Sequence, residues 1–182
     1  MRILVPLLAS LAVAAMPAGA MSPEEAYAAI PHPRVTFDAK TSKLPAGQSE
    51  SLQRLFSLSD QGVILRIEGI RAQRSRNVAE LKRILAGYDS LIDDLQRQSF
   101  TAEVAPARDH VVRALRDHKS YLASRPEGGM QFAQNELLTA PLVRQASASL
   151  HRAYELMLKT FPEEPARNKD SFEQYMCALD YL

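Results

Sequence analysis

The apolar positions of this chain recur every three to four residues over most of its length, which is the period of an amphipathic α-helix. Alternating apolar and polar runs of the kind that form strands are nearly absent. Between clusters of Pro and Gly, the pattern therefore predicts four long helices. Their expected ranges are 48–74, 78–98, about 102–106 to about 124, and Thr139 to Phe161 with Pro141 in the first turn.

Two shorter helices are expected outside this set. Ser22 and Glu25 have the spacing of a capping box, which predicts a helix over 22–30. A C-terminal helix is predicted over 169–182, with Asn168 as its N-cap. Its apolar face consists of Phe172, Tyr175, Met176, Leu179 and Leu182. Residues 31–47 are rich in Pro and are predicted to form an extended loop.

Four amphipathic helices with mostly short connections predict an all-α fold, an up-down four-helix bundle. The short N-terminal helix with its extended segment, and the amphipathic C-terminal helix, are expected to pack on that bundle. The chain then divides into a signal peptide at 1–20, an N-terminal helix and extended clasp at 21–47, the bundle at 48–161 and a C-terminal docking helix at 162–182.

The first twenty residues have the pattern of a secretory signal peptide. Arg2 precedes an apolar run, and Ala18-Gly19-Ala20 has the small-residue spacing of a cleavage site. The run is too short to cross a hydrocarbon core of ~30 Å as a mature helix. We therefore expect cleavage after Ala20 and a mature protein that is periplasmic or secreted.

The composition narrows the choice of partners. The chain has 22 Lys and Arg against 21 Asp and Glu, a formal net charge of +1. A chain with so little net charge is not expected to bind nucleic acid. No later apolar stretch reaches ~20 residues, so no membrane span is expected in the mature chain. The expected partner is an unidentified protein or small molecule.

Cys177 is the only cysteine, so the chain has neither a CxxCH haem motif nor a cysteine pair for zinc. If Phe172, Tyr175 and Met176 face the bundle, Cys177 points away from it. An exposed thiol in an oxidising compartment favours a dimer linked through Cys177 or a mixed disulfide. The alternative is that both sides of the helix are covered and the thiol is inert.

The 48–74 helix is apolar on two sides, which indicates burial between two neighbours. One stripe contains Leu52, Phe56, Val63, Ile67 and Ile70, and the other contains Leu58, Gly62, Leu65, Gly69 and Ala72. Gly62 and Gly69 each cost ~1 kcal/mol in a helix relative to Ala. They therefore predict a close backbone contact, either with another helix of the bundle or with a partner segment in a groove.

Four side chains near this helix are candidate binding residues. Arg66 lies between the two stripes. It is interpreted as part of a structural ion pair, for which Asp38 is a candidate partner, or as an anion-binding group. The segment 30–38 adds His32 and Arg34 and is stiffened by two prolines. It is expected to lie across the bundle, anchored by Ile30 and Phe37. It is interpreted as a structural clasp or as a binding loop.

His118 lies at the centre of the apolar face of the 102–124 helix. A single histidine in such a place is interpreted as a buried, hydrogen-bonded core residue. The alternative is an axial ligand of non-covalently bound haem b, with Met157 as the second ligand. The chain contains no E-x-x-H motif, so a di-iron carboxylate site is not expected.

Sequence motifs for enzyme chemistry are missing. The chain has no G-x-S-x-G, no H-E-x-x-H, no phosphate-binding loop and no dinucleotide fingerprint. We therefore favour a soluble, exported, non-enzymatic protein that binds a partner through the 48–74 helix and the 30–38 segment. A haem-binding electron carrier is the alternative, and an enzyme is the least favoured hypothesis.

Overall fold

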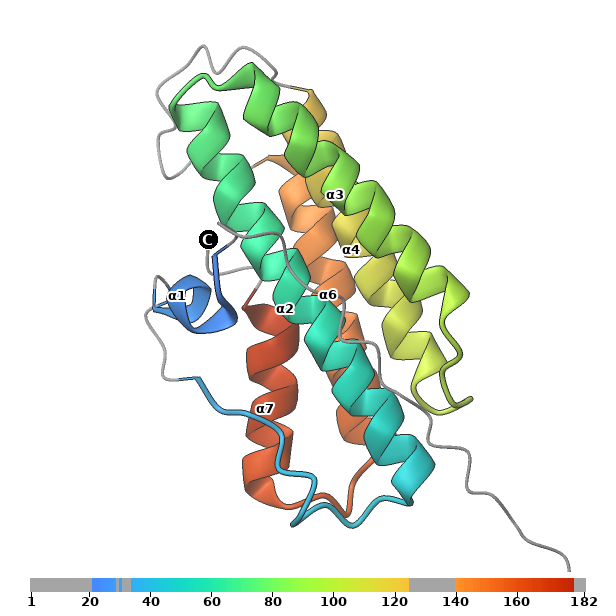
Figure 1. Ribbon diagram of the computed structural model, residues 1–182. Coiled ribbons are helices and arrows are strands. Elements are labelled where there is room, and N and C mark those ends of the chain that lie inside the picture. Colours follow the sequence, from blue (N-terminus) through green and yellow to red (C-terminus); the bar gives the residue numbers. More distant parts are fainter. Residues whose placement is uncertain (1–20, 29, 31–33, 125–139, 179–182) are drawn as a thin grey trace, which may run out of the picture.

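The computed structural model describes residues 21–28, 30, 34–124 and 140–178. Within these ranges the chain forms six helices and no strand, which confirms the predicted all-α bundle (Figure 1). The helices are α1 (Pro23–Tyr27), α2 (Ala46–Arg74), α3 (Val78–Arg97), α4 (Ala105–Ala123), α6 (Pro141–Thr160) and α7 (Ala166–Cys177). The predicted signal peptide and His32 lie outside the described residues.

The four long helices α2, α3, α4 and α6 run side by side, each consecutive pair pointing in opposite directions (Figure 1). Helix α3 packs on both α2 and α4, and α4 packs along α6. Helix α7 contacts both α6 and α2, so it closes one end of the bundle between them. Helix α1 packs against α2. The α2 helix thus has neighbours on several sides.

Local side-chain caps set the starts of α1 and α3. At α1, the Ser22 hydroxyl accepts from the Glu25 amide at 3.2 Å and the Glu25 carboxylate accepts from the Ser22 amide at 2.8 Å. At α3, the Asn77 side chain accepts from the Glu80 amide at 3.1 Å. These contacts satisfy amide groups that the first turn of a helix leaves unpaired. The predicted capping box at Ser22 is confirmed.

The predicted cap at Asn168 is wrong. Helix α7 begins at Ala166, with Pro165 in the N-cap position. Asn168 lies inside the first turn and is fully buried, and its side chain bonds to the segment before α2. A proline can precede the first turn of a helix without a side-chain cap. The Asn168 side chain is therefore not needed as a cap and can bond to a segment that is distant in the sequence.

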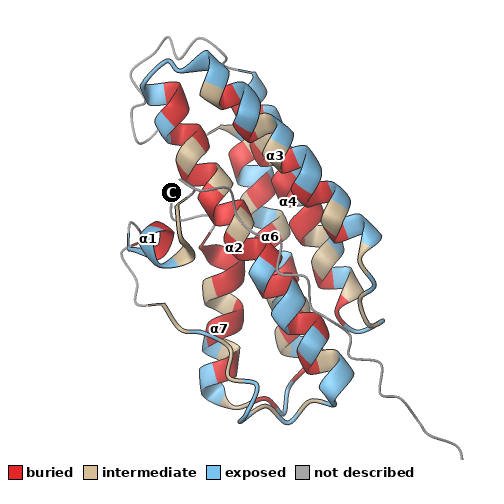
Figure 2. Cartoon of the chain, in the orientation of Figure 1, coloured by how far each residue is buried: buried red, intermediate tan, exposed pale blue. Residues whose placement is uncertain are grey.

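Burial follows the predicted pattern on α2, where both apolar stripes face inward except at the half-buried Leu65 (Figure 2). A Cβ built on Gly69 would lie 2.6 Å from Leu122 Cδ1, well inside van der Waals contact. The neighbour of Gly69 is therefore the Leu122 side chain of α4, and not another backbone as predicted. Gly62 is also buried. On the neighbouring helix, Gly87 receives the side chain of Leu65 in the same way.

The interpretation of Cys177 as an exposed thiol is wrong. Its exposed fraction is 3%. Helix α7 contacts both α2 and α6, and Cys177 lies on the buried part of its surface. A dimer linked through this thiol is therefore not supported. Among the described residues, no helix is both long enough and apolar enough to cross a membrane.

Candidate functional site

Residues 34–45 form a non-helical segment, here called the strap, that joins α1 to α2 and lies beside α7 (Figure 1). Phe37 anchors it: its ring centroid lies 5.7 Å from that of Phe56 on α2 and 6.3 Å from that of Phe172 on α7. Ile30, just before the strap, is buried. Both predicted anchors are thus in place.

The second half of the strap is tied to α7 by buried polar groups. The Asp38 amide donates to Asn168 Oδ1 at 2.9 Å, and Asn168 Nδ2 donates back to the Asp38 carbonyl at 3.2 Å. The buried Glu164 carboxylate accepts from the Lys43 amide at 2.7 Å and from the Ser42 hydroxyl at 3.1 Å. These bonds satisfy backbone groups that the strap cannot pair within itself.

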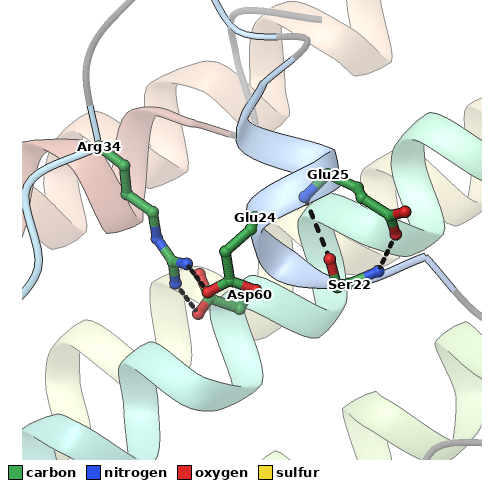
Figure 3. A network of polar contacts seen from close by, with 5 residues as sticks. All are labelled: Ser22, Glu24, Glu25, Arg34 and Asp60. Atoms are coloured by element: carbon green, nitrogen blue, oxygen red, sulfur yellow. Dashed lines mark hydrogen bonds and ion pairs between the residues drawn. The ribbon is translucent and has the colours of Figure 1, made fainter.

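The first residue of the strap, Arg34, lies in a site built by three other elements. Its Nη2 donates to Asp60 Oδ2 of α2 at 2.5 Å, and its Nη1 donates to Glu24 Oε1 of α1 at 3.0 Å (Figure 3). The guanidinium carbon lies 4.4 Å from the ring centroid of Tyr27 and 5.9 Å from that of Tyr175. We call these five residues the Arg34 site.

Burial dominates the electrostatics of this site. The Asp60 side chain is only 11% exposed, and burial raises its pKa to about 6 although the Arg34 charge acts to lower it. Burial likewise raises the pKa of the Tyr27 and Tyr175 hydroxyls, so both stay neutral. Asp60 is therefore the charged acceptor that faces the two rings, and Arg34 is its counter-ion.

The Arg34–Asp60 contact leaves hydrogen-bonding capacity unused. The buried Tyr27 hydroxyl interacts with the Asp60 carboxylate, whereas Arg34 Nε is buried and has no hydrogen-bond partner among the described residues. A guanidinium group and a carboxylate can form two parallel hydrogen bonds, which is the stronger arrangement. Arg34 makes one such bond to Asp60, so the pair is held short of its best geometry.

The four residues predicted from the sequence do not form one site. Arg34 and Asp38 lie on the strap, whereas Arg66 is buried in the bundle at 3% exposure. The suggested Asp38–Arg66 pair is not formed, since Asp38 bonds to Asn168 and to the amide of Lys40. The fourth residue, His32, lies outside the described part of the chain.

His118 is fully buried, as predicted, but the expectation that it is hydrogen-bonded is wrong. Within the described residues, neither ring nitrogen has a hydrogen-bond partner. Burial and the nearby Arg66 charge hold the pKa of His118 well below its usual value, so the ring is neutral. Met157 is buried on α6, the helix that packs along α4.

The residues that complete the Arg34 site were missed by the sequence argument. Tyr27, Asp60 and Tyr175 come from α1, α2 and α7, and no spacing connects them. Asp60 did carry a signal, because with Ser59 it interrupts an apolar part of α2. The criterion that singled out Arg66, a polar group among apolar stripes, applies equally to Asp60.

Two other sites are less suited to a partner. A shallow pocket at the start of α2 is lined in part by Arg54 and Phe100, but Arg54 already donates to the Ser99 carbonyl at 2.7 Å. In the described part of the chain, no three His, Cys, Asp or Glu residues are grouped so that they could hold a metal ion. The Arg34 site is therefore the strongest candidate.

Comparison with known proteins gives no further guide: the chain matches no family model, no curated protein and no solved structure.

Proposed function

We propose that this chain is an exported, non-enzymatic binding protein and that its partner engages the Arg34 site. The bundle supplies a rigid support, and the strap supplies a short irregular segment over it. Binding residues are commonly carried by such segments on rigid scaffolds. Export is proposed from the signal-peptide pattern of residues 1–20.

The observation that carries this proposal is the buried Asp60 carboxylate. Its counter-ion, Arg34, comes from a non-helical strap and bonds only one of the two carboxylate oxygens. Burying an ionised group is costly unless it is paired and hydrogen-bonded. A carboxylate buried to this extent, whose counter-ion lies on a non-helical segment, is suited to receiving a cation from a partner.

The test is a quantitative capture experiment from extract of the compartment to which the protein is exported. Asp60→Asn is compared with Glu68→Gln, a matched control on the same helix. Glu68 is paired with Arg83 at 2.8 Å and its side chain is 15% exposed, close to the 11% of Asp60. We expect one component that wild type and Glu68→Gln retain and Asp60→Asn loses. Equal retention by all three proteins would contradict the proposal.

Haem binding is the second candidate. The observation in its favour is that His118 is neutral and that its ring nitrogens have no partner within the described residues. An absorption spectrum of the exported protein tests it, because haem ligation gives a Soret band that His118→Leu and Met157→Leu should each alter. A protein without that band, purified from haem-replete cells, would contradict this candidate.

A further inference from the structure

We propose that Tyr27, Asp60 and Tyr175 form a recognition site for an alkylguanidinium group. Arg34 occupies this site in the present structure, and an arginine side chain or arginine-like small molecule takes its place in the complex. This inference deepens the proposed function and rests on it, since it names the chemistry that the partner presents.

The site has the two components that recognise organic cations. Aromatic faces attract a cation through the ring quadrupole, and a carboxylate supplies the opposite charge. Arg34 lies within 6 Å of both ring centroids, the range in which this attraction operates. Because Asp60 is buried, the attraction is screened less by solvent than it is for a surface ion pair.

The site is built to keep its shape when Arg34 leaves. Tyr175 is held from α7 by stacking on Phe56, with ring centroids 4.3 Å apart and an interplanar angle of 9°. Asp60 lies in the interior of the long helix α2. A site whose groups are already ordered binds a ligand with a smaller entropy cost. The Tyr175 ring and the Asp60 carboxylate therefore stay available to a second cation.

The two carboxylate oxygens of Asp60 favour a guanidinium over an ammonium group. Arg34 bonds only one of them, Oδ2. A planar guanidinium can bond both oxygens in parallel and stack on a ring, whereas an ammonium is a compact, strongly hydrated point charge. A ligand that approaches without the constraint of the strap can reach this two-bond geometry, which Arg34 does not.

Arg34 can leave without dismantling the rest of the strap. Phe37 packs on Phe56, and the Asp38–Asn168 bonds hold the chain immediately beyond. The second ion pair of Arg34 is with Glu24, whose side chain is 77% exposed, and such exposed pairs contribute little. The ligand competes chiefly with the effective concentration of a tethered Arg34, which for short tethers is in the millimolar range.

The experiment removes the Arg34 side chain from the site and then adds ligands that can take its place. In Arg34→Ala, the melting temperature and the heat of binding are measured against ethylguanidinium, arginine amide and a Gly-Arg-Gly peptide. Ethylammonium and the neutral N-ethylurea are the matched ligand controls. The double variant Arg34→Ala, Asp60→Asn is the matched protein control, because it keeps both tyrosines and removes only the carboxylate charge.

We expect saturable binding of the three guanidinium compounds to Arg34→Ala, with ethylguanidinium about tenfold tighter than ethylammonium. The double variant should lose at least about tenfold in affinity. A tripeptide that binds tighter than ethylguanidinium assigns the site to a protein ligand, and equal binding assigns it to a small guanidinium compound. Equal responses to all ligands, including N-ethylurea, would overturn the proposal.

If Arg34→Ala does not fold, the same ligands are titrated into wild type while the Arg34 side-chain signal is followed by NMR. Displacement of that signal by guanidinium compounds, and not by N-ethylurea, is the expected result. An Arg34 side-chain signal that stays unchanged at the highest soluble ligand concentration would overturn the inference. If Asp60-dependent capture persists while guanidinium binding fails, the proposed function stands and only the assigned chemistry is wrong.

Discussion

At the scale of single residues, Gly69 marks the place where helix α2 packs closely against α4. The side chain of Leu122 from α4 occupies the space that a Cβ on Gly69 would need. Gly47, in the first turn of the same helix, has nothing within 4 Å of the corresponding position. The two glycines therefore offer a matched comparison within one helix.

We predict opposite effects of alanine at these two positions. Gly69→Ala should lower the free energy of unfolding by about 1–2 kcal/mol, because the displacement of Leu122 outweighs the better helix propensity. Gly47→Ala should leave it unchanged or raise it by up to about 1 kcal/mol. Urea denaturation measures both, and stabilisation by Gly69→Ala would show that the α2–α4 contact is looser than described.

His118 is a residue whose protonation should affect stability. Its pKa in the folded protein lies well below the usual value of 6.5, so the unfolded chain binds the proton more tightly. The stability that the neutral ring contributes is present above about pH 6.5 and is lost as the pH falls toward the folded-state pKa. Acid should therefore destabilise the bundle through this group.

We predict that His118→Leu reduces this loss of stability at acid pH. It should also raise the free energy of unfolding near neutral pH by roughly 1 kcal/mol, because no hydrogen bond is lost and a buried polar group is removed. His151→Gln is the control, since His151 is exposed on α6. Denaturation curves at about pH 5 and about pH 8 measure the effect. An unchanged difference between the two pH values in His118→Leu would contradict it.

At the scale of elements, the helices could be predicted from the sequence and the contacts between them could not. The Asn77–Glu80 spacing marks a helix start by local chemistry, so α3 begins where expected, and α6 begins at Pro141, two residues after the expected Thr139. Asn168 carries an equally good capping signal, yet α7 begins before it. Its amide bonds Asp38, 130 residues away in sequence, and no local rule anticipates a contact of that kind.

The same limit explains the candidate site. Arg34 was identified because it lies in an unusual proline-rich segment, but its partner Asp60 is 26 residues away on another element. The two tyrosines on either side of Arg34 come from opposite ends of the chain. A single sequence contains the residue types of such a site and does not contain their distances.

We predict that Asn168 holds the second half of the strap. Asn168→Ala should lower the free energy of unfolding by about 2 kcal/mol, because it removes bonds to Asp38 and leaves the buried Glu164 with fewer donors. It should also speed tryptic cleavage after Lys40 and Lys43. Thr41→Ala removes an exposed contact on the same strap and should do neither. Equal cleavage in both variants would contradict this role.

At the scale of the whole molecule, the bundle buries its apolar stripes among its own helices (Figure 2), and the Arg34 site lies where the strap meets α1, α2 and α7. The size of the chain is sufficient for such a core, since a chain of this length buries about 70% of its unfolded surface without a disulfide or metal. The packing of the helices therefore accounts for the stability of the fold. The Arg34 site is the feature that the need for a stable fold explains least.

The proposed export also belongs to the scale of the whole molecule. We predict that mass spectrometry of the protein recovered from the producing cell's exported fraction gives Met21 as the first residue, because Ala18-Gly19-Ala20 closes the apolar run. Ala20→Lys should block this cleavage, and Ser22→Ala should not. Recovery of protein that begins at Met1 in that fraction would contradict the assignment.

The central claim is that Arg34, at the start of the strap, can leave its site while the bundle stays folded, and hydrogen exchange tests it most directly. Amides of the strap bond to side chains and turns, whereas those of α4 lie in a continuous helix within the core. The account predicts that peptides covering 34–44 exchange through local opening, faster than α4, and that Arg34→Ala speeds the strap alone. Exchange of the strap at the rate of α4, by global unfolding only, would contradict it.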